Sequence, residues 1–155
     1  MSSVLIVGQS SQAKTIFAYR LASRLNQAES FRRWQGEQAV PFQVVLERLV
    51  DHTAGVISLA PYFGLIRESR PALVILVQPS RTTERQGRLE SDMVEEAAAL
   101  VLCIGTLAPL RIVVEDQIED PGLIEQIALA LETLLYSELA PPLLPLIQRS
   151  EKLPV

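Results

Sequence analysis

The chain has 155 residues, of which 48 % are hydrophobic and 21 % charged, and its formal net charge is -4. This length predicts one domain that can bury a core without disulfides or metal ions. The 14 basic residues are dispersed, which argues against a protein that binds the phosphate backbone of nucleic acid. No apolar run approaches the roughly 18 residues of a membrane span, so we expect no membrane insertion.

Signals for sorting, redox chemistry and metal binding are sparse. Met1–Ser3 lacks the basic region and cleavage site of a signal peptide, so we expect a cytoplasmic protein. Cys103 is the only cysteine and excludes an intrachain disulfide. His52 is the only histidine, and it has no second ligand at metal-binding spacing. No cofactor is expected.

The first predicted elements are a strand, a tight loop and a helix. An apolar run, Val4–Val7, stops at a glycine and passes into an amphipathic pattern that predicts a helix over Gln12–Asn26. The unpaired N–H groups and the dipole of a helix N-terminus attract anions. We therefore expect a weak anion-binding loop, with candidate ligands Gly8, Ser10, Ser11, Lys14 and Thr15.

Strand and helix patterns then alternate along the chain. Residues 27–38 are polar and predict a loop or a frayed helix end. Strands are predicted at Val40–Leu46, Gly55–Leu59 and Ala72–Val77, with two helical turns at Tyr62–Ser69. The strand Ala72–Val77 is apolar on both faces, as expected of a central parallel strand between helices.

A long helix is predicted from Thr83 onward. Its expected apolar stripe consists of Leu89, Met93, Ala97 and Leu100, and its expected exposed side carries Glu90, Asp92, Glu95 and Glu96. The following run, Val101–Gly105, is compatible with a helix end or a short strand, and we favour the strand.

The last predicted elements are a strand and a capped helix. Arg111–Val114 has a strand pattern, and Asp120 and Pro121 have the residue types of an N-cap and a first helical position. The stripe of this helix is Ile124, Ile127, Ala128, Leu131 and Leu134 or Leu135. The acidic residues Glu115, Asp116, Glu119 and Asp120 are interpreted as a solvated turn at a helix N-terminus rather than a cation site.

Together these patterns predict an α/β doubly wound domain over residues 1–138, with a mainly parallel sheet of four to five strands between helices. Residues 139–155 form a tail rich in Leu and Pro, which we expect to pack on this domain or on a partner. Ligands of such sheets bind beyond the carboxyl ends of the strands. The loops expected there are Gly8–Lys14, Ala60–Phe63, Gln78–Arg85 and Glu115–Asp120.

The loop after the first strand also resembles a phosphate-binding loop. Gly8–Thr15, with the sequence GQSSQAKT, is one residue short of a Walker A motif because Ala13 stands in place of the second glycine. A β-carbon at this position penalises the tight wrapping of a true P-loop. No apolar run ends in a metal-holding Asp, and Ile112–Asp116 comes closest, so we expect no nucleotide hydrolysis.

A second resemblance covers more of the chain. In order and approximate spacing, Val4–Leu21, Ala54–Ile66 and Pro71–Val77 resemble the IIB proteins of the lactose and cellobiose phosphotransferase systems. In that family a strand ends in a phosphorylated cysteine within a loop of small residues. Here Gly8 stands in the place of the cysteine, and Cys103 is too distant to replace it. The resemblance therefore implies a relative that keeps the scaffold and cannot carry phosphocysteine.

Two functional hypotheses follow. The first is a non-catalytic module that acts by contact with a protein partner or with itself, through the tail or an exposed helix. It is favoured because the sequence shows no nucleophile with a base, no metal cluster and no complete phosphate loop. The second is a phosphate- or nucleotide-binding protein of degenerate IIB-like or P-loop-like type, supported by Lys14 in the loop. We favour the first.

Overall fold

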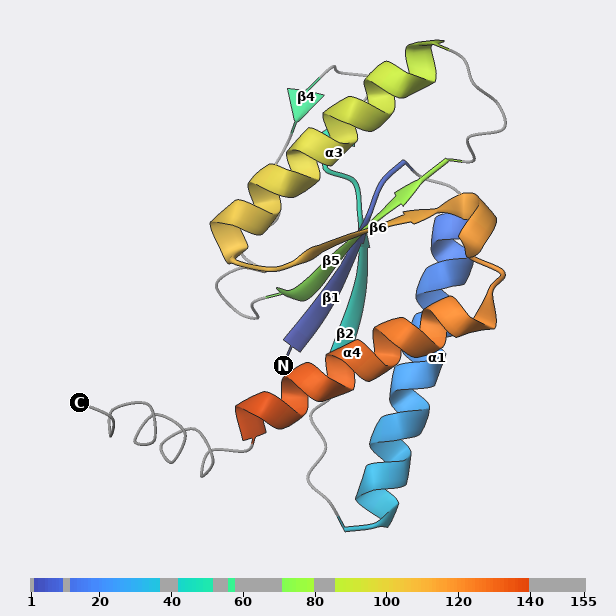
Figure 1. Cartoon of the computed structure of the whole chain (residues 1–155), viewed down its shortest axis with the longest axis vertical. Helices are drawn as coiled ribbons and strands as arrows, with labels where there is room; N and C mark the ends of the chain where they lie inside the picture. Colours follow the sequence, from blue (N-terminus) through green and yellow to red (C-terminus); the bar gives the residue numbers. More distant parts are fainter. Residues whose placement is uncertain are drawn as a thin grey trace, which may run out of the picture.

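The computed structural model describes residues 2–9, 12–36, 42–51, 56–57, 71–79 and 86–139. Its centre is a four-stranded, all-parallel sheet in the order β2-β1-β5-β6 (Figure 1). The strands are β1 (Ser2–Val7), β2 (Phe42–Glu47), β5 (Pro71–Gln78) and β6 (Leu110–Val114). Helices cover both faces, so the predicted α/β three-layer architecture is confirmed.

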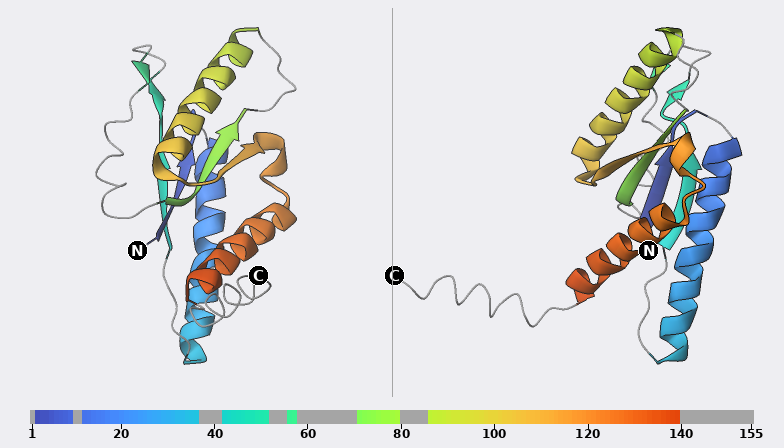
Figure 2. Two further views of the ribbon diagram at one scale, coloured as in Figure 1. Left: turned by 60° about the vertical axis from the view of Figure 1, so that its left-hand side comes forward. Right: turned by 45° about the vertical axis from the view of Figure 1, so that its right-hand side comes forward.

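The two helical layers are unequal. α1 (Gln12–Trp34) and α4 (Pro121–Leu139) share one face of the sheet, and α3 (Gln86–Thr106) lies on the other face (Figure 2). On the α3 side, β3 (Val50–Asp51) and β4 (Val56–Ile57) form a short antiparallel ribbon. A 3-10 turn, η1 (Glu115–Gln117), connects β6 to α4.

The central strands bury both of their faces. In β1, Val4 and Ile6 join the core cluster under α1 and α4, whereas Leu5 and Val7 join the cluster under α3. All four side chains are fully buried. A strand with no polar face is stable only between two helical layers, which is why the uninterrupted apolar runs predicted this architecture correctly.

α1 is longer than the sequence pattern predicted. It passes the expected end at Asn26 and continues to Trp34, since no Gly or Pro interrupts it and Glu29 pairs with Arg33 at 2.6 Å. Gly36 then adopts a left-handed conformation, with φ of 78°, and ends the helix. The polar composition of this stretch reflects an exposed helix rather than a loop.

α4 begins as predicted and forms ion pairs with α1. Asp120 Oδ1 accepts a hydrogen bond from the backbone N–H of Gly122 at 2.9 Å, which confirms Asp120 as the cap. Arg24 donates to Glu125 at 2.7 and 2.8 Å and to Glu132 at 3.1 Å. The hydrogen bond to Glu125 raises the pKa of Arg24, and the same bond lowers the pKa of Glu125.

Two sequence-based predictions for α3 are wrong. Val101–Gly105 continues the helix instead of forming a strand, because the position beside β5 is taken by β6 and the preceding alanines favour helix. The predicted apolar stripe also faces the wrong way: Met93 is 68 % exposed, whereas Glu95 is 2 % exposed. Small residues approach the sheet instead, led by Ala98 and Ala99.

Several predictions concern residues outside the described ranges. These are the ends of the strand Gly55–Leu59, the helical turns at Tyr62–Ser69, the loops Ala60–Phe63 and Ser80–Arg85, His52, and residues 140–155. Among the residues that the structure describes, no helix is long and apolar enough to span a membrane.

Candidate functional site

The predicted anion loop begins where the topology of the sheet reverses. From β1 the chain crosses to β2 on one side, whereas β5 leads to β6 on the other, so the carboxyl ends of β1 and β5 flank the switch point. Gly8 lies there with φ of 133°. A β-carbon at this position would lie 2.5 Å from the carbonyl oxygen of Val77. The glycine is therefore required by the close approach of β1 and β5.

Lys14 lies in the first turn of α1 and is only 5 % exposed. Its Nζ donates to the backbone oxygen of Gly8 at 2.9 Å and to that of Glu47 at 3.2 Å. The ammonium group thus joins the start of α1 to the carboxyl ends of β1 and β2. Burial lowers the pKa of Lys14 from its ordinary value of 10.5; Glu95 opposes this shift and Arg48 adds to it.

Glu95 brings a carboxylate to this edge from the opposite face of the sheet. It belongs to α3, and its negative charge acts on the ammonium of Lys14. A buried carboxylate and a buried ammonium favour each other's charged forms, because each reduces the cost of removing the other from water. The helical pattern predicts Glu95 on the exposed side, which is wrong, and it therefore gives no sign of this electrostatic link between α1 and α3.

The predicted anion ligands are only partly described. Gly8 is buried against β5, Lys14 is turned toward two carbonyl oxygens, and Thr15 is half buried. Ser10 and Ser11 lie outside the described ranges. In this conformation the lysine stabilises the loop itself, and an incoming anion would have to compete with those carbonyl groups for the ammonium. Anion binding by these five residues stays a prediction.

In the part of the chain that the structure describes, the remaining reactive groups do not converge on one site. Cys103 is buried between α3 and the sheet, and burial raises the pKa of its thiol, which disfavours the nucleophilic thiolate. Asp120 is engaged as the cap of α4. Within the described ranges, no three His, Cys, Asp or Glu side chains gather to hold a metal ion.

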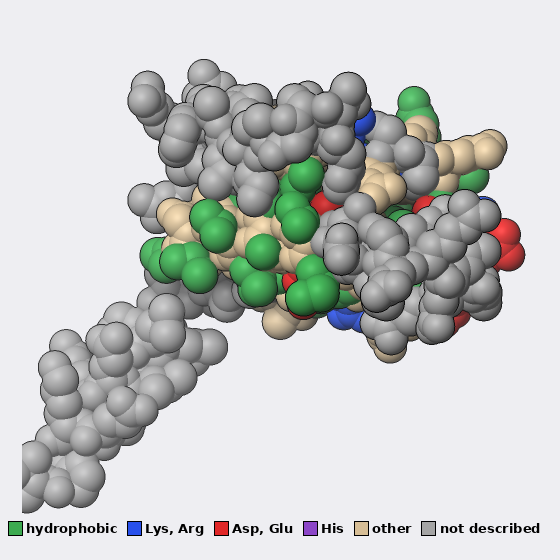
Figure 3. Space-filling view, turned by 90° about the horizontal axis from the view of Figure 1, so that it is seen from above, with side chains coloured by type: hydrophobic (Ala, Val, Ile, Leu, Met, Phe, Trp, Pro, Cys, Tyr) green, Lys and Arg blue, Asp and Glu red, His purple; other side chains and the backbone are tan. Residues whose placement is uncertain are grey.

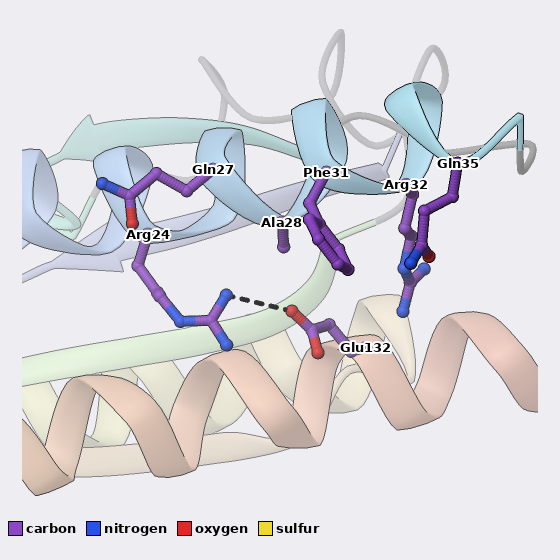
Figure 4. Close-up of a pocket in the computed structure, with 7 residues that line it drawn as sticks. All are labelled: Arg24, Gln27, Ala28, Phe31, Arg32, Gln35 and Glu132. Carbon is purple, nitrogen blue, oxygen red and sulfur yellow. Dashed lines mark hydrogen bonds and ion pairs between the residues drawn. The ribbon is translucent and has the colours of Figure 1, made fainter.

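A shallow groove of about 480 Å³ lies between α1 and α4. Figure 4 shows Phe31 and Arg32 extending from α1 toward α4, with Arg24 bonded to Glu132 across the groove. Phe31 also stacks on the exposed Trp34, with ring centroids 6.3 Å apart. The pairing of Arg24 with two carboxylates offsets its positive charge, which disfavours the binding of an anion by this side chain.

Among the described residues, exposed apolar side chains are concentrated on the outer face of α3. This term denotes the exposed apolar side chains of the helix and of the residue that follows it: Met93, Val94, Ala97, Leu100, Val101, Ile104 and Leu107. Apolar side chains gather over α3 on the side of the molecule shown in Figure 3. The opposite side of the helix is apolar too, since Ala98, Ala99, Leu102 and Cys103 contact the core. α3 therefore has two apolar faces, of which the sheet covers one.

A sequence signal for this face exists. Residues 97–108 contain no charged side chain, although they include the last turns of a helix that covers only one face of the sheet. An amphipathic helix in that position normally has a polar outer side. If Val101–Gly105 is interpreted as a buried strand, its apolar residues are expected, so they do not indicate an exposed apolar face.

No protein-family model matches the chain, and no curated protein is similar enough to count as a relative.

Proposed function

We propose that this chain is a non-catalytic α/β interaction module whose contact surface is the outer face of α3. The observation that carries the proposal is the second apolar face of this helix. Ile104 is 75 % exposed and Leu107 is 87 % exposed. Isolated surface apolar residues are ordinary, but a continuous stripe along one helix is typical of a surface that binds another protein.

The free energy available on this surface is large enough for association. Fully burying one side chain of this size contributes about 1.5–3 kcal/mol. The six large side chains of the outer face are between 41 % and 87 % exposed. Covering them would therefore release roughly 5–10 kcal/mol per copy before the entropic cost of association is subtracted.

The backbone at Leu107 supports the same proposal. Leu107 follows the last residue of α3 with φ of 58°, a left-handed conformation that costs a residue with a β-carbon about 1–2 kcal/mol. Glycine is the usual residue at such a helix end. A strained position that holds a large exposed leucine is consistent with selection for contact rather than for stability of the isolated domain.

The phosphate-binding alternative has weaker support. A phosphate loop uses its lysine to hold phosphate oxygens, whereas Lys14 is bonded to two backbone carbonyl groups. Its buried charge already has a structural role at the end of the sheet.

The proposal can be tested by photo-crosslinking in cells that express the chain. A benzophenone amino acid would replace Ile104 on the outer face of α3, and in a matched control it would replace Leu129, which is 50 % exposed on α4. We expect one or a few discrete adducts from the position of Ile104, abolished by adding Leu107→Glu, and none from the position of Leu129. The proposal is contradicted if Ile104 forms no adduct or if both positions give the same adducts.

A further inference from the structure

We propose that the occupant of the outer face of α3 is a second copy of this chain, paired antiparallel about a two-fold axis that passes near Leu100 and Val101. This inference rests on the proposed function and names its partner. Its basis is the distribution of charge and of side-chain size along the helix.

Charge along α3 is strongly asymmetric. Its charged residues all lie in the first half, as Arg88, Glu90, Asp92, Glu95 and Glu96. A parallel pair would place two acidic segments side by side and repel. An antiparallel pair centred near Leu100 joins the uncharged halves and carries the acidic segments to opposite ends. The charge pattern therefore selects the antiparallel orientation.

The sizes of the side chains fit the same axis. With the axis midway between Leu100 and Val101, Ile104 of each copy faces Ala97 of the other, and Leu107 faces Val94. Ile104 is large and 75 % exposed, and Ala97 is a small exposed residue, so a large side chain meets a small one at this pair of symmetric positions. Interlocking of large and small residues allows helices to pack at about 8–10 Å.

A neighbouring glycine allows close approach of the two helices. A β-carbon added to Gly105, which is exposed on α3, would have nothing within 4 Å, so the surface beside Ile104 is open. A two-fold dimer uses the same surface patch twice and requires it to be complementary to itself. The pairing of Ile104 with Ala97, which the axis repeats on the other copy, meets that requirement.

The buried area indicates a moderate affinity. Stable interfaces usually bury about 800 Å² per partner, and one helical stripe supplies only part of that area. We therefore expect a dissociation constant in the micromolar range, roughly 1–100 μM.

The experiment is sedimentation velocity of the full chain over a concentration series from below to above this range. We expect the mass to change from that of a monomer to that of a dimer. Ile104→Glu should weaken association by at least roughly 30-fold, as expected of a central interface residue. Leu129→Glu makes the same chemical change on α4 and should leave association unchanged. Equal effects of the two substitutions would overturn the inference.

A second measurement tests the orientation by disulfide formation in a Cys103→Ser background. Leu100→Cys should give a disulfide-linked dimer on mild oxidation, because the residue lies at the axis, whereas Met93→Cys should not. Efficient linkage through Met93→Cys without linkage through Leu100→Cys would overturn the antiparallel arrangement.

The failures of the two proposals are distinguishable. If the chain stays monomeric at all concentrations while the position of Ile104 crosslinks to a different protein, the second copy is the wrong partner and the proposed function survives. If the chain stays monomeric and that position gives no adduct, both proposals fail.

Discussion

Substitution of Gly8 by alanine tests whether the switch point of the sheet has the close backbone approach seen in the structure. Two costs are expected. A residue with a β-carbon at φ of 133° is strained by about 1–3 kcal/mol. The new β-carbon would also lie 2.5 Å from the carbonyl oxygen of Val77, and the backbone shift that relieves this overlap adds about 1–3 kcal/mol.

We therefore expect Gly8→Ala to lower the free energy of unfolding by roughly 2–6 kcal/mol in total. For a chain of this size each kcal/mol corresponds to about 2–4 °C, so the melting temperature should fall by roughly 4–24 °C. Urea unfolding and thermal melts followed by circular dichroism would measure both quantities.

Two other glycines separate the causes. Gly36 has φ of 78° and no atom within 4 Å of an added β-carbon, so Gly36→Ala should show the strain alone, about 1–2 kcal/mol. Gly105 is helical and equally open, and Gly105→Ala should stabilise the domain by about 0.5–1 kcal/mol. If Gly8→Ala costs no more than Gly36→Ala, the close approach to Val77 is not a real constraint.

Three further predictions concern the lysine, the loop and the end of α3. Burial lowers the pKa of Lys14 below 10.5, so on raising the pH the folded protein releases this proton before the unfolded chain does. The free energy of unfolding of the wild type should therefore increase relative to that of Lys14→Met as the pH rises from 7 toward 10.5. If urea unfolding shows a constant difference between the two proteins over that range, this prediction is wrong. Phosphate should bind the loop with only millimolar affinity, roughly -4 kcal/mol. In an NMR titration we expect amide shifts confined to residues 8–15 and no shifts in Lys14→Ala. Shifts that persist in the variant would show that phosphate binds elsewhere. Leu107→Gly should raise the stability of the monomer by up to about 1 kcal/mol in thermal melts, because it removes the backbone strain at this position. The same substitution should weaken association in sedimentation. A loss of monomer stability would show that the backbone of Leu107 is not strained.

The architecture was predictable because its signals are local and redundant. The runs Val4–Val7 and Ala72–Val77 lack a polar face, so only a sheet covered on both sides could bury them. The start of α4 was equally clear, since Asp120 and Pro121 each favour the position they occupy.

The orientation of α3 was not predictable from periodicity alone. Met93, Ala97 and Leu100 recur at helical spacing, but so do Ala98, Leu102 and Thr106. The sheet selects the second set because small side chains permit a close approach. Both stripes satisfy the same period, and only the tertiary contact decides between them.

The environment of Lys14 was only half predicted. Its position at the start of a helix followed from the pattern of the first strand and loop. The contact of its ammonium with the oxygen of Glu47 depends on the parallel pairing of β1 and β2, which places two residues 33 positions apart at the same edge. The effect of Glu95 on the pKa of Lys14 depends on a third element, α3, and sequence patterns do not show that α3 lies close to Lys14.

The most direct test of the antiparallel contact through α3 is the distance between two spin labels attached at Met93→Cys, one on each copy, in a Cys103→Ser background. A helix rises 1.5 Å per residue and packed helices lie about 8–10 Å apart, so an axis near Leu100 and Val101 separates the two labelled Cα atoms by roughly 25 Å. We expect a single distance population near that value, lost when Ile104→Glu is added. A population near roughly 10 Å would indicate parallel helices, and the absence of any defined distance at concentrations that saturate association would contradict contact through this face.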